Sequence, residues 1–200
     1  MKLLVATGNP GKLVEVREIL GGMDFELVSL AELGLDAPEE PFATFHENAA
    51  AKATACAPRA SLWTLADDSG LCVDALDGGP GVRSARFADT DEARRRKLLE
   101  HLRGVPAARR GAHFFCAVAL SSPDGRRIYR AEGRVDGRIA EAPRGTNGFG
   151  YDPLFLPDET PGKTLAELGS AEKNRLSHRG RALERLRPLL LRLARDGDLG

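Results

Sequence analysis

The sequence has no long apolar run, and this absence excludes a membrane-spanning helix. The longest uninterrupted apolar stretch, Phe114–Leu120, is far shorter than the roughly 18 residues that a helix needs to cross a bilayer. Met1–Leu3 leads directly into a strand-like segment without the pattern of a signal peptide. We therefore expect a protein of the cytoplasm that has no membrane partner.

Cysteine and histidine are scarce. Cys56, Cys72 and Cys116 are too few and too scattered for a disulfide framework, and none belongs to a CxxC pair. Each lies among alanine, leucine or valine, which predicts buried and reduced thiols. The four histidines form no HxxxH or HxxEH pattern, so we do not expect a catalytic zinc site.

Net charge is absent as well, because 29 Lys and Arg balance 29 Asp and Glu. With 42% hydrophobic residues, this balance excludes an intrinsically disordered chain and predicts a folded protein with a proper core. The charge is not evenly spread. Residues 173–195 hold eight Lys and Arg against the single acid Glu184. This cationic end favours either a solvated helix face or a phosphorylated ligand or polyanion.

Strand-like and helical patterns alternate along the 200 residues, which predicts an α/β fold. Strands are expected at 3–6, 26–30, 62–66, 71–73, 113–120, 127–131 and 134–139, and helices at 12–20, 44–57, 91–102 and from about 177 onward. The last three strand-like runs resemble an antiparallel arrangement, so the sheet should be mixed. Pro188 should kink the last helix or split it in two.

A glycine-rich turn, Ala6–Lys12 (ATGNPGK), joins the first strand to the first helix. Backbone N–H groups and the helix dipole favour anions at such a place, and Lys12 adds a positive charge. The segment is not a Walker A loop, because Ala6 and Leu13 stand where that motif needs Gly and Ser or Thr. It is either a phosphate cradle or an ordinary Gly-Pro turn with an exposed lysine.

An acidic tetrapeptide, Asp67–Gly70 (DDSG), separates two expected strands. Adjacent carboxylates repel each other unless a cation or hydrogen-bond donors compensate them, and a divalent metal meets this need. Mg²⁺ takes hard oxygen ligands together with water and substrate phosphates, and Glu39–Glu40 would add a carboxylate. The alternative is an acidic β-turn whose aspartates cap backbone groups.

Two later segments carry groups suited to a nucleoside base. Thr146–Pro153 exposes Phe149 between glycines, an arrangement that presents a ring for stacking, although it would also plug a small apolar hole. Asp152 would read a polar base edge. Glu172–Asn174 and Ser177–Gly180 bring further donors to the last helix. Together, a phosphate cradle, a carboxylate metal site and a stacking aromatic indicate a nucleoside triphosphate site.

The sequence also resembles the inosine/xanthosine triphosphate pyrophosphatases, over residues 4–183. Six ordered blocks carry the resemblance: 6–12, 44–53, 66–71, 80–86, 148–153 and 177–180. The resemblance implies a single domain over residues 1–200, built as an elongated two-lobed subunit with a central mixed sheet, flanking helices and the active site in the cleft. It also implies a homodimer, Mg²⁺ as cofactor and no stable nucleic-acid partner.

The activity implied by the resemblance is hydrolysis of ITP, dITP, XTP and dXTP between the α and β phosphates, which removes these nucleotides from the pool. Asp68 would accept a proton from the attacking water, Glu40 and Asp68 would hold Mg²⁺, and Ser69 would contact substrate. The phosphates would be held by Thr7, Gly8, Asn9, Pro10, Gly11, Lys12 and Lys52. The base would be surrounded by Phe149, Gly150, Tyr151, Asp152, Lys173, His178 and Arg179.

One stretch departs from the family pattern. Such proteins tend to have Glu-Glu-Thr-Gly before the Thr-Phe pair, whereas this chain has Glu39–Ala43 (EEPFA), so the choice of Glu40 over Glu39 stays open. Two other functions also stay open. One is a pyrophosphatase of similar architecture that acts on pyrimidine or modified nucleotides. The other is a non-catalytic protein whose basic C-terminal helix binds nucleic acid.

Overall fold

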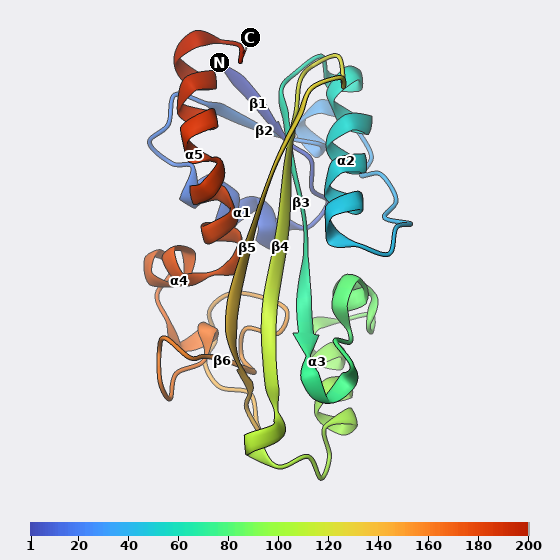
Figure 1. The fold of residues 1–200 in the computed structure, drawn as a ribbon, viewed down its shortest axis with the longest axis vertical. Coiled ribbons are helices and arrows are strands. Elements are labelled where there is room, and N and C mark those ends of the chain that lie inside the picture. Colours follow the sequence, from blue (N-terminus) through green and yellow to red (C-terminus); the bar gives the residue numbers. More distant parts are fainter. Residues whose placement is uncertain (200) are drawn as a thin grey trace. The chain divides into compact units, whose positions relative to one another are not determined.

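A computed structural model describes residues 1–199 and contains one six-stranded mixed sheet (Figure 1). The strands are β1 (Lys2–Val5), β2 (Glu26–Ser29), β3 (Thr64–Val73), β4 (Gly111–Ser121), β5 (Ile128–Ile139) and β6 (Phe155–Pro157), in the order β2-β1-β3-β4-β5-β6. Strand β1 is parallel to β2 and β3, whereas β5 and β6 are antiparallel. The predicted α/β fold with a mixed sheet is confirmed.

Five α-helices accompany the sheet in the described residues: α1 (Pro10–Ile19), α2 (Phe45–Ala60), α3 (Asp91–His101), α4 (Ser170–Leu176) and α5 (His178–Asp196). Local signals explain where they begin. Asn9 caps α1 with Pro10 at its first position, Thr44 caps α2, and Thr90 caps α3 ahead of two acidic residues. A membrane-spanning helix is not found among residues 1–199.

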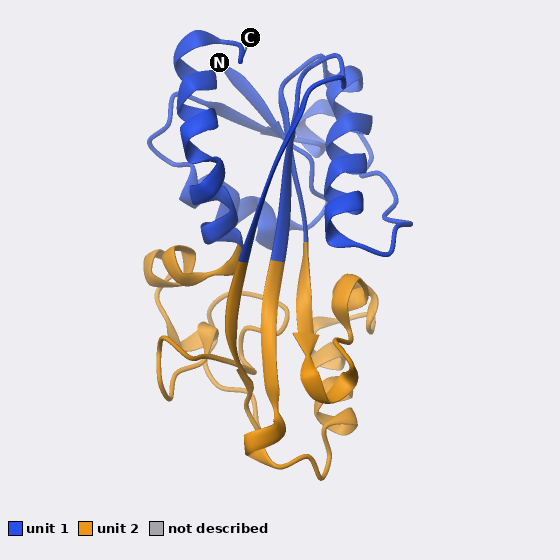
Figure 2. Cartoon of the chain, viewed as in Figure 1, with its two compact units in different colours: residues 1–68, 116–133, 179–200 blue, residues 69–115, 134–178 orange. Residues whose placement is uncertain are grey.

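The chain forms two compact units, shown in Figure 2. Unit 1 comprises residues 1–68, 116–133 and 179–200, and unit 2 comprises residues 69–115 and 134–178. Strands β3, β4 and β5 each contribute residues to both units. Two unit boundaries fall inside the predicted site motifs, one between Asp68 and Ser69 and the other between His178 and Arg179.

Unit 1 has its apolar core on the face of the strands that α1 and α5 cover, while α2 lies on the other side (Figure 1). Helix α5 contributes a stripe of leucines at helical spacing, Leu183, Leu186, Leu190 and Leu193, and all four are buried. They pack with Leu3, Val5 and Leu65 of the strands. This packing holds β1, which is followed by the predicted phosphate residues 7–12, and β3, which contains Asp68.

Unit 2 has a separate core. Leu98 and Leu102 from α3 and the segment after it pack with Leu71 and Val73 of β3 and with the ring of Phe114, which meets Phe155 edge-on. Tyr151 and Leu154 also belong to this core. The chain between β5 and β6, which includes the predicted base-binding segment, is therefore anchored by buried side chains at its C-terminal part.

Three expectations about local structure were wrong. Residues 67–70 do not form a turn but lie inside the continuous strand β3. The runs 127–131 and 134–139 are one strand, β5. Of the two alternatives for Pro188, the split does not occur, because α5 is continuous over His178–Asp196. Cys56 and Cys116 are buried free thiols as predicted, but Cys72 is partly exposed. Its neighbours Leu71 and Val73 belong to the core of unit 2, and successive residues of a strand point to opposite faces.

Candidate active site

The turn between β1 and α1 is organised by Asn9. The Asn9 side chain accepts hydrogen bonds from the N–H groups of Gly11 at 2.9 Å and Lys12 at 3.2 Å, and the Asn9 N–H donates to the Thr7 hydroxyl at 3.2 Å. The Asn9 side chain thus occupies two N–H groups of the first turn of α1. A phosphate in this turn would therefore bind through Lys12 and the helix dipole, or would displace the Asn9 side chain.

Asp67 lies at the centre of a buried group of charges in unit 1. Its Oδ2 atom accepts from Nε and Nη2 of Arg179 at 3.2 and 3.0 Å and lies 3.1 Å from Nζ of Lys12. Arg179 also forms an ion pair with Glu15. Asp67 is 4% exposed and Arg179 is 1% exposed. Two cations and two carboxylates thus compensate each other inside the protein.

The charges around Asp67 fix its ionisation. Burial alone would raise the pKa of Asp67, but the positive charges of Lys12, Arg179 and Lys52 and the hydrogen bond from Arg179 outweigh burial and hold the pKa well below its usual range. A carboxylate of this kind is a poor proton acceptor. Asp67 is therefore suited to fixing Lys12 and Arg179 in place.

Asp68 has different surroundings, because successive residues of a strand point to opposite faces. Its Oδ2 atom accepts from the uncharged side-chain amide of Asn48 at 2.9 Å. Asn48 in turn bonds both backbone groups of Phe42, at 3.0 and 3.2 Å, which ties the 39–43 segment to α2. One turn later on α2, Lys52 forms an ion pair with Glu40.

The pKa of Asp68 moves in the opposite direction from that of Asp67. Burial raises the pKa of Asp68 and the neighbouring negative charge of Glu40 raises it further, which outweighs the opposing effects of Lys52, Lys12 and the Asn48 hydrogen bond. Two carboxylates that repel each other at a poorly solvated point form a donor set suited to a divalent cation. The structure brings Glu40, and not the exposed Glu39, into this group.

The described residues contain no cluster of three or more metal-ligating His, Cys, Asp or Glu side chains. Glu40 and Asp68 alone would leave most positions of a Mg²⁺ shell to water and phosphate oxygens. That pattern is usual for Mg²⁺ at nucleotide sites. The residues present therefore fit the predicted cofactor.

The predicted base-binding segment lies in unit 2 and is held by Asp152. Oδ2 of Asp152 accepts from the Phe149 N–H at 2.8 Å and from Nζ of Lys173 at 2.5 Å. Nζ of Lys173 also lies 5.1 Å from the centre of the half-buried Phe149 ring. Asp152 is thus engaged with its own loop and with Lys173.

Gly148 shows how closely this loop is packed. Its φ of +74° is in the left-handed region, and a Cβ atom there would overlap the Asp152 carboxylate and lie 2.7 Å from Nζ of Lys173. Gly150 is fixed by hydrogen bonds at both backbone groups, from its N–H to Asp91 at 2.7 Å and from Arg95 to its carbonyl at 2.7 Å. The loop therefore has a defined conformation.

Tyr151 and His178 are also positioned by unit 2. Tyr151 is buried, and its hydroxyl donates to the Ser84 carbonyl at 3.0 Å, so its ring is part of the core. The His178 ring is stacked on Phe114, with a centroid distance of 4.7 Å and an interplanar angle of 8°. Arg179, predicted beside the base, instead lies in unit 1 with Glu15 and Asp67.

The predicted residues thus form two groups. Unit 1 holds the phosphate and metal residues, Thr7, Gly8, Asn9, Pro10, Gly11, Lys12, Glu40, Lys52 and Asp68, and unit 2 holds Ser69, Phe149, Gly150, Tyr151, Asp152, Lys173 and His178. Glu15 and the donor role of Asn48 were not predicted from the sequence. Glu15 had a detectable signal, since it is three residues from Lys12 and therefore on the same side of α1.

Comparison with known proteins matches residues 3–189 to the model of the Ham1 family. This chain belongs to the Ham1 family. A dITP/XTP pyrophosphatase of Geobacter sulfurreducens is 52% identical over 191 residues, covering 93% of this chain and 94% of that protein. A dITP/XTP pyrophosphatase of Bacillus subtilis is 48% identical over 191 residues, covering 94% of this chain and 96% of that protein.

Solved structures of the family agree with this assignment. A HAM1 protein from Coxiella burnetii matches with a TM-score of 0.84 at 40% identity, covering 96% of this chain and 99% of that chain. The predicted relationship to the inosine/xanthosine triphosphate pyrophosphatases is thereby confirmed at the level of the family.

Proposed function

We propose that this Ham1 family member hydrolyses inosine and xanthosine triphosphates, in ribose and deoxyribose forms, to the nucleoside monophosphate and pyrophosphate. The relatives named dITP/XTP pyrophosphatase support this activity. The structural observation that carries it is the contrast on strand β3. Asp67 is neutralised by Lys12 and Arg179, whereas Asp68 is held by an uncharged amide beside Glu40.

Asp68 is the proton acceptor in this proposal. Its hydrogen bond from Asn48 fixes the carboxylate, and a water molecule would approach this fixed carboxylate in the substrate complex. Burial raises the pKa of Asp68, and a carboxylate of higher pKa is a stronger base. The water oxygen attacks the α phosphorus, its proton passes to Asp68, and the bond from the α phosphorus to the bridging oxygen breaks.

Lys12 and Lys52 hold the triphosphate. Their charges face the phosphate oxygens in the substrate and in the leaving pyrophosphate, and both lysines are kept in place by carboxylates, Asp67 and Glu40. We propose Glu40 and Asp68 as the residues that hold Mg²⁺. When bound there, Mg²⁺ would neutralise negative charge on the phosphates and orient them.

Unit 2 recognises the base in this proposal. The Phe149 ring supplies an apolar face, and Lys173 and His178 supply polar groups for the 6-oxo edge that hypoxanthine and xanthine share. Asp152 fixes Lys173 and the backbone of Phe149. Adenine presents a donor at position 6 and no N1–H, so a donor aimed at that position discriminates against ATP.

The substrate also suggests the setting. Nucleoside triphosphates are cytoplasmic, so we propose that the protein acts in the cytoplasm. We further propose that it acts as a homodimer and on free nucleotides, without a nucleic-acid partner.

A nucleotide panel with product identification tests the function. ITP, XTP, their deoxy forms, ATP, GTP and pyrimidine triphosphates are each incubated with Mg²⁺ or with EDTA, and products are separated by anion exchange. We expect IMP and pyrophosphate in equal amounts from ITP, no IDP at early times and no turnover with EDTA. Stepwise release of IDP and orthophosphate would contradict the proposed bond cleavage, and a preference for pyrimidines would contradict the proposed base.

A further inference from the structure

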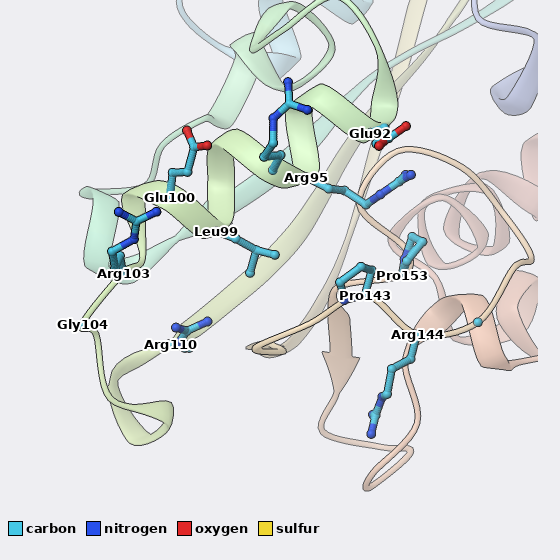
Figure 3. Close-up of a pocket in the computed structure, with 12 residues that line it drawn as sticks. Glu92, Arg95, Leu99, Glu100, Arg103, Gly104, Arg110, Pro143, Arg144 and Pro153 are labelled. Atoms are coloured by element: carbon cyan, nitrogen blue, oxygen red, sulfur yellow. The ribbon is translucent and has the colours of Figure 1, made fainter.

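Unit 2 contains a cavity of about 830 Å³ that is lined by none of the residues proposed for the nucleotide site. One side is formed by residues of α3 and the residues that follow it, and the other by Pro143–Gly145 and Pro153 (Figure 3). The volume is typical of sites for small molecules, which range from about 300 to 1,000 Å³. All its lining residues belong to unit 2.

Arginine dominates the charge of this cavity. Five arginines stand against two glutamates; they are Arg95, Arg96, Arg103, Arg110 and Arg144, with Glu92 and Glu100. Among the described residues, Arg144 is the one of the five that forms an ion pair, with Glu167 at 3.5 Å. Within residues 1–199, the other four guanidinium groups form no ion pair with a carboxylate. Their mutual repulsion favours an anion in the cavity.

Arg110 gives the strongest support for an anion site, because this charged residue is only 8% exposed. Its guanidinium donates to three carbonyl groups, those of Val105 at 3.0 Å, Leu102 at 3.1 Å and Ala140 at 3.3 Å. Leu102 caps the C-terminus of α3, where the helix dipole supplies roughly half a negative charge. The remainder of the buried positive charge has no counter-charge, which is costly unless a ligand supplies one.

The donor geometry indicates what kind of anion fits. A guanidinium has five N–H donors, and three of those of Arg110 are in use, so two remain. Arg96 and Arg103 line the cavity and are exposed, and neither guanidinium makes a hydrogen bond among the described residues, so their donors are available for a ligand. Planar arginine forks match the oxygens of phosphate groups. We propose that the cavity is a second anion site that binds a small phosphorylated molecule.

Calorimetric titration of the full chain tests this proposal. Pyrophosphate, inorganic phosphate and IMP are titrated separately in EDTA, so that no metal contributes. Arg96→Gln with Arg103→Gln removes two charges from the cavity, while Arg110 is spared because it caps α3. The matched control is Arg109→Gln with Arg130→Gln, two exposed arginines that do not line the cavity.

We expect the cavity pair to abolish one binding site or weaken it by at least ~10-fold, and the control pair to change it by less than ~2-fold. A site that prefers pyrophosphate identifies a polyphosphate ligand, and one that prefers IMP over phosphate identifies a nucleotide. The proposal is overturned if the cavity pair leaves every site intact or if both pairs weaken binding equally. Sedimentation velocity is measured on the same variants. If the cavity pair changes only the sedimentation coefficient, the cavity belongs to a contact between copies of the chain and the proposal is overturned.

Discussion

Two nitrogens of Arg179 donate to a single oxygen of Asp67, at 3.2 and 3.0 Å, and this oxygen also lies 3.1 Å from Nζ of Lys12. The next residue along the strand, Asp68, accepts instead from the neutral amide of Asn48. One sequence motif thus contains two carboxylates with opposite shifts in pKa. Their roles should therefore be separable by mutation.

Asp67→Asn should act on stability. Removing the Asp67 charge leaves Lys12 and Arg179 buried without this counter-charge. Breaking a buried ion pair in this way lowers the free energy of unfolding by about 3–5 kcal/mol. We expect a decrease of this size in the free energy of unfolding, measured by urea denaturation. The control is Asp158→Asn, an exposed aspartate, which should stay within about 0.5 kcal/mol of the original protein. A stable Asp67→Asn variant without activity would show that Asp67, and not Asp68, performs the chemistry.

Asp68→Asn should act on turnover. Loss of the proton acceptor should lower kcat by at least ~10²-fold, the usual scale for a general base. Stability should be retained or improved, because burial raises the pKa of Asp68 and a neutral amide avoids the cost of a buried negative charge. Initial rates with ITP and urea denaturation measure the two effects. Turnover equal to that of the original protein would remove Asp68 from the mechanism.

Lys12→Met should weaken triphosphate binding more than monophosphate binding. The Lys12 charge faces phosphate oxygens, and a triphosphate presents more of them than a monophosphate. We expect an affinity loss of about 10–100-fold for a non-hydrolysable ITP analogue and a smaller loss for IMP, measured by calorimetry. Equal losses for both ligands would indicate that Lys12 serves mainly to compensate Asp67.

Gly148→Ala should disturb base recognition. The new Cβ would overlap the Asp152 carboxylate and crowd Lys173, so the contact between those two residues must change. We expect KM for ITP to rise by about 10-fold, a scale set by misplaced binding groups. Gly162→Ala is the matched control, because Gly162 has a similar φ of +84° but open space around it. If both variants raise KM equally, backbone strain alone explains the effect.

His178 should contribute to the choice between ITP and ATP. Loss of a hydrogen bond to the 6-oxo group should lower the ITP/ATP ratio of kcat/KM by about 10-fold or more, while the ITP/GTP ratio changes little, since GTP carries the same edge. His178→Phe is the preferred variant because it keeps the stacking on Phe114 and removes the ring nitrogens. A His178→Phe enzyme with the full preference for ITP would show that other groups read position 6.

The α/β class, the mixed sheet and most elements followed from the sequence, because hydrophobic periodicity and caps are local signals. Thr44 and the alanine-rich run predicted α2, and the leucine stripe predicted α5. The acidic motif misled because Asp, Ser and Gly are common in turns. Here the extended backbone is stabilised by partners from α1, α2 and α5, which no local pattern reveals.

The site was predictable in composition but not in its pairings. Lysines and carboxylates could be identified from their motifs, whereas the contact between Glu15 and Arg179 joins residues 164 positions apart. The ion pair of Glu40 with Lys52 likewise depends on tertiary structure, so sequence alone could not choose between Glu39 and Glu40 as its partner. Pro188 does not split α5, and buried leucines of this helix lie on both sides of it.

The chain passes from one unit to the other four times, at 68/69, 115/116, 133/134 and 178/179. A chimera that combined one relative's unit 1 with another's unit 2 would therefore need four splice points. Two of them would cut directly after Asp68 and directly before Arg179. Recombination of whole units is thus a poor route to new base preference in this fold. Under the proposed base recognition, altered specificity should arise through point changes within the 146–153 loop and around Lys173.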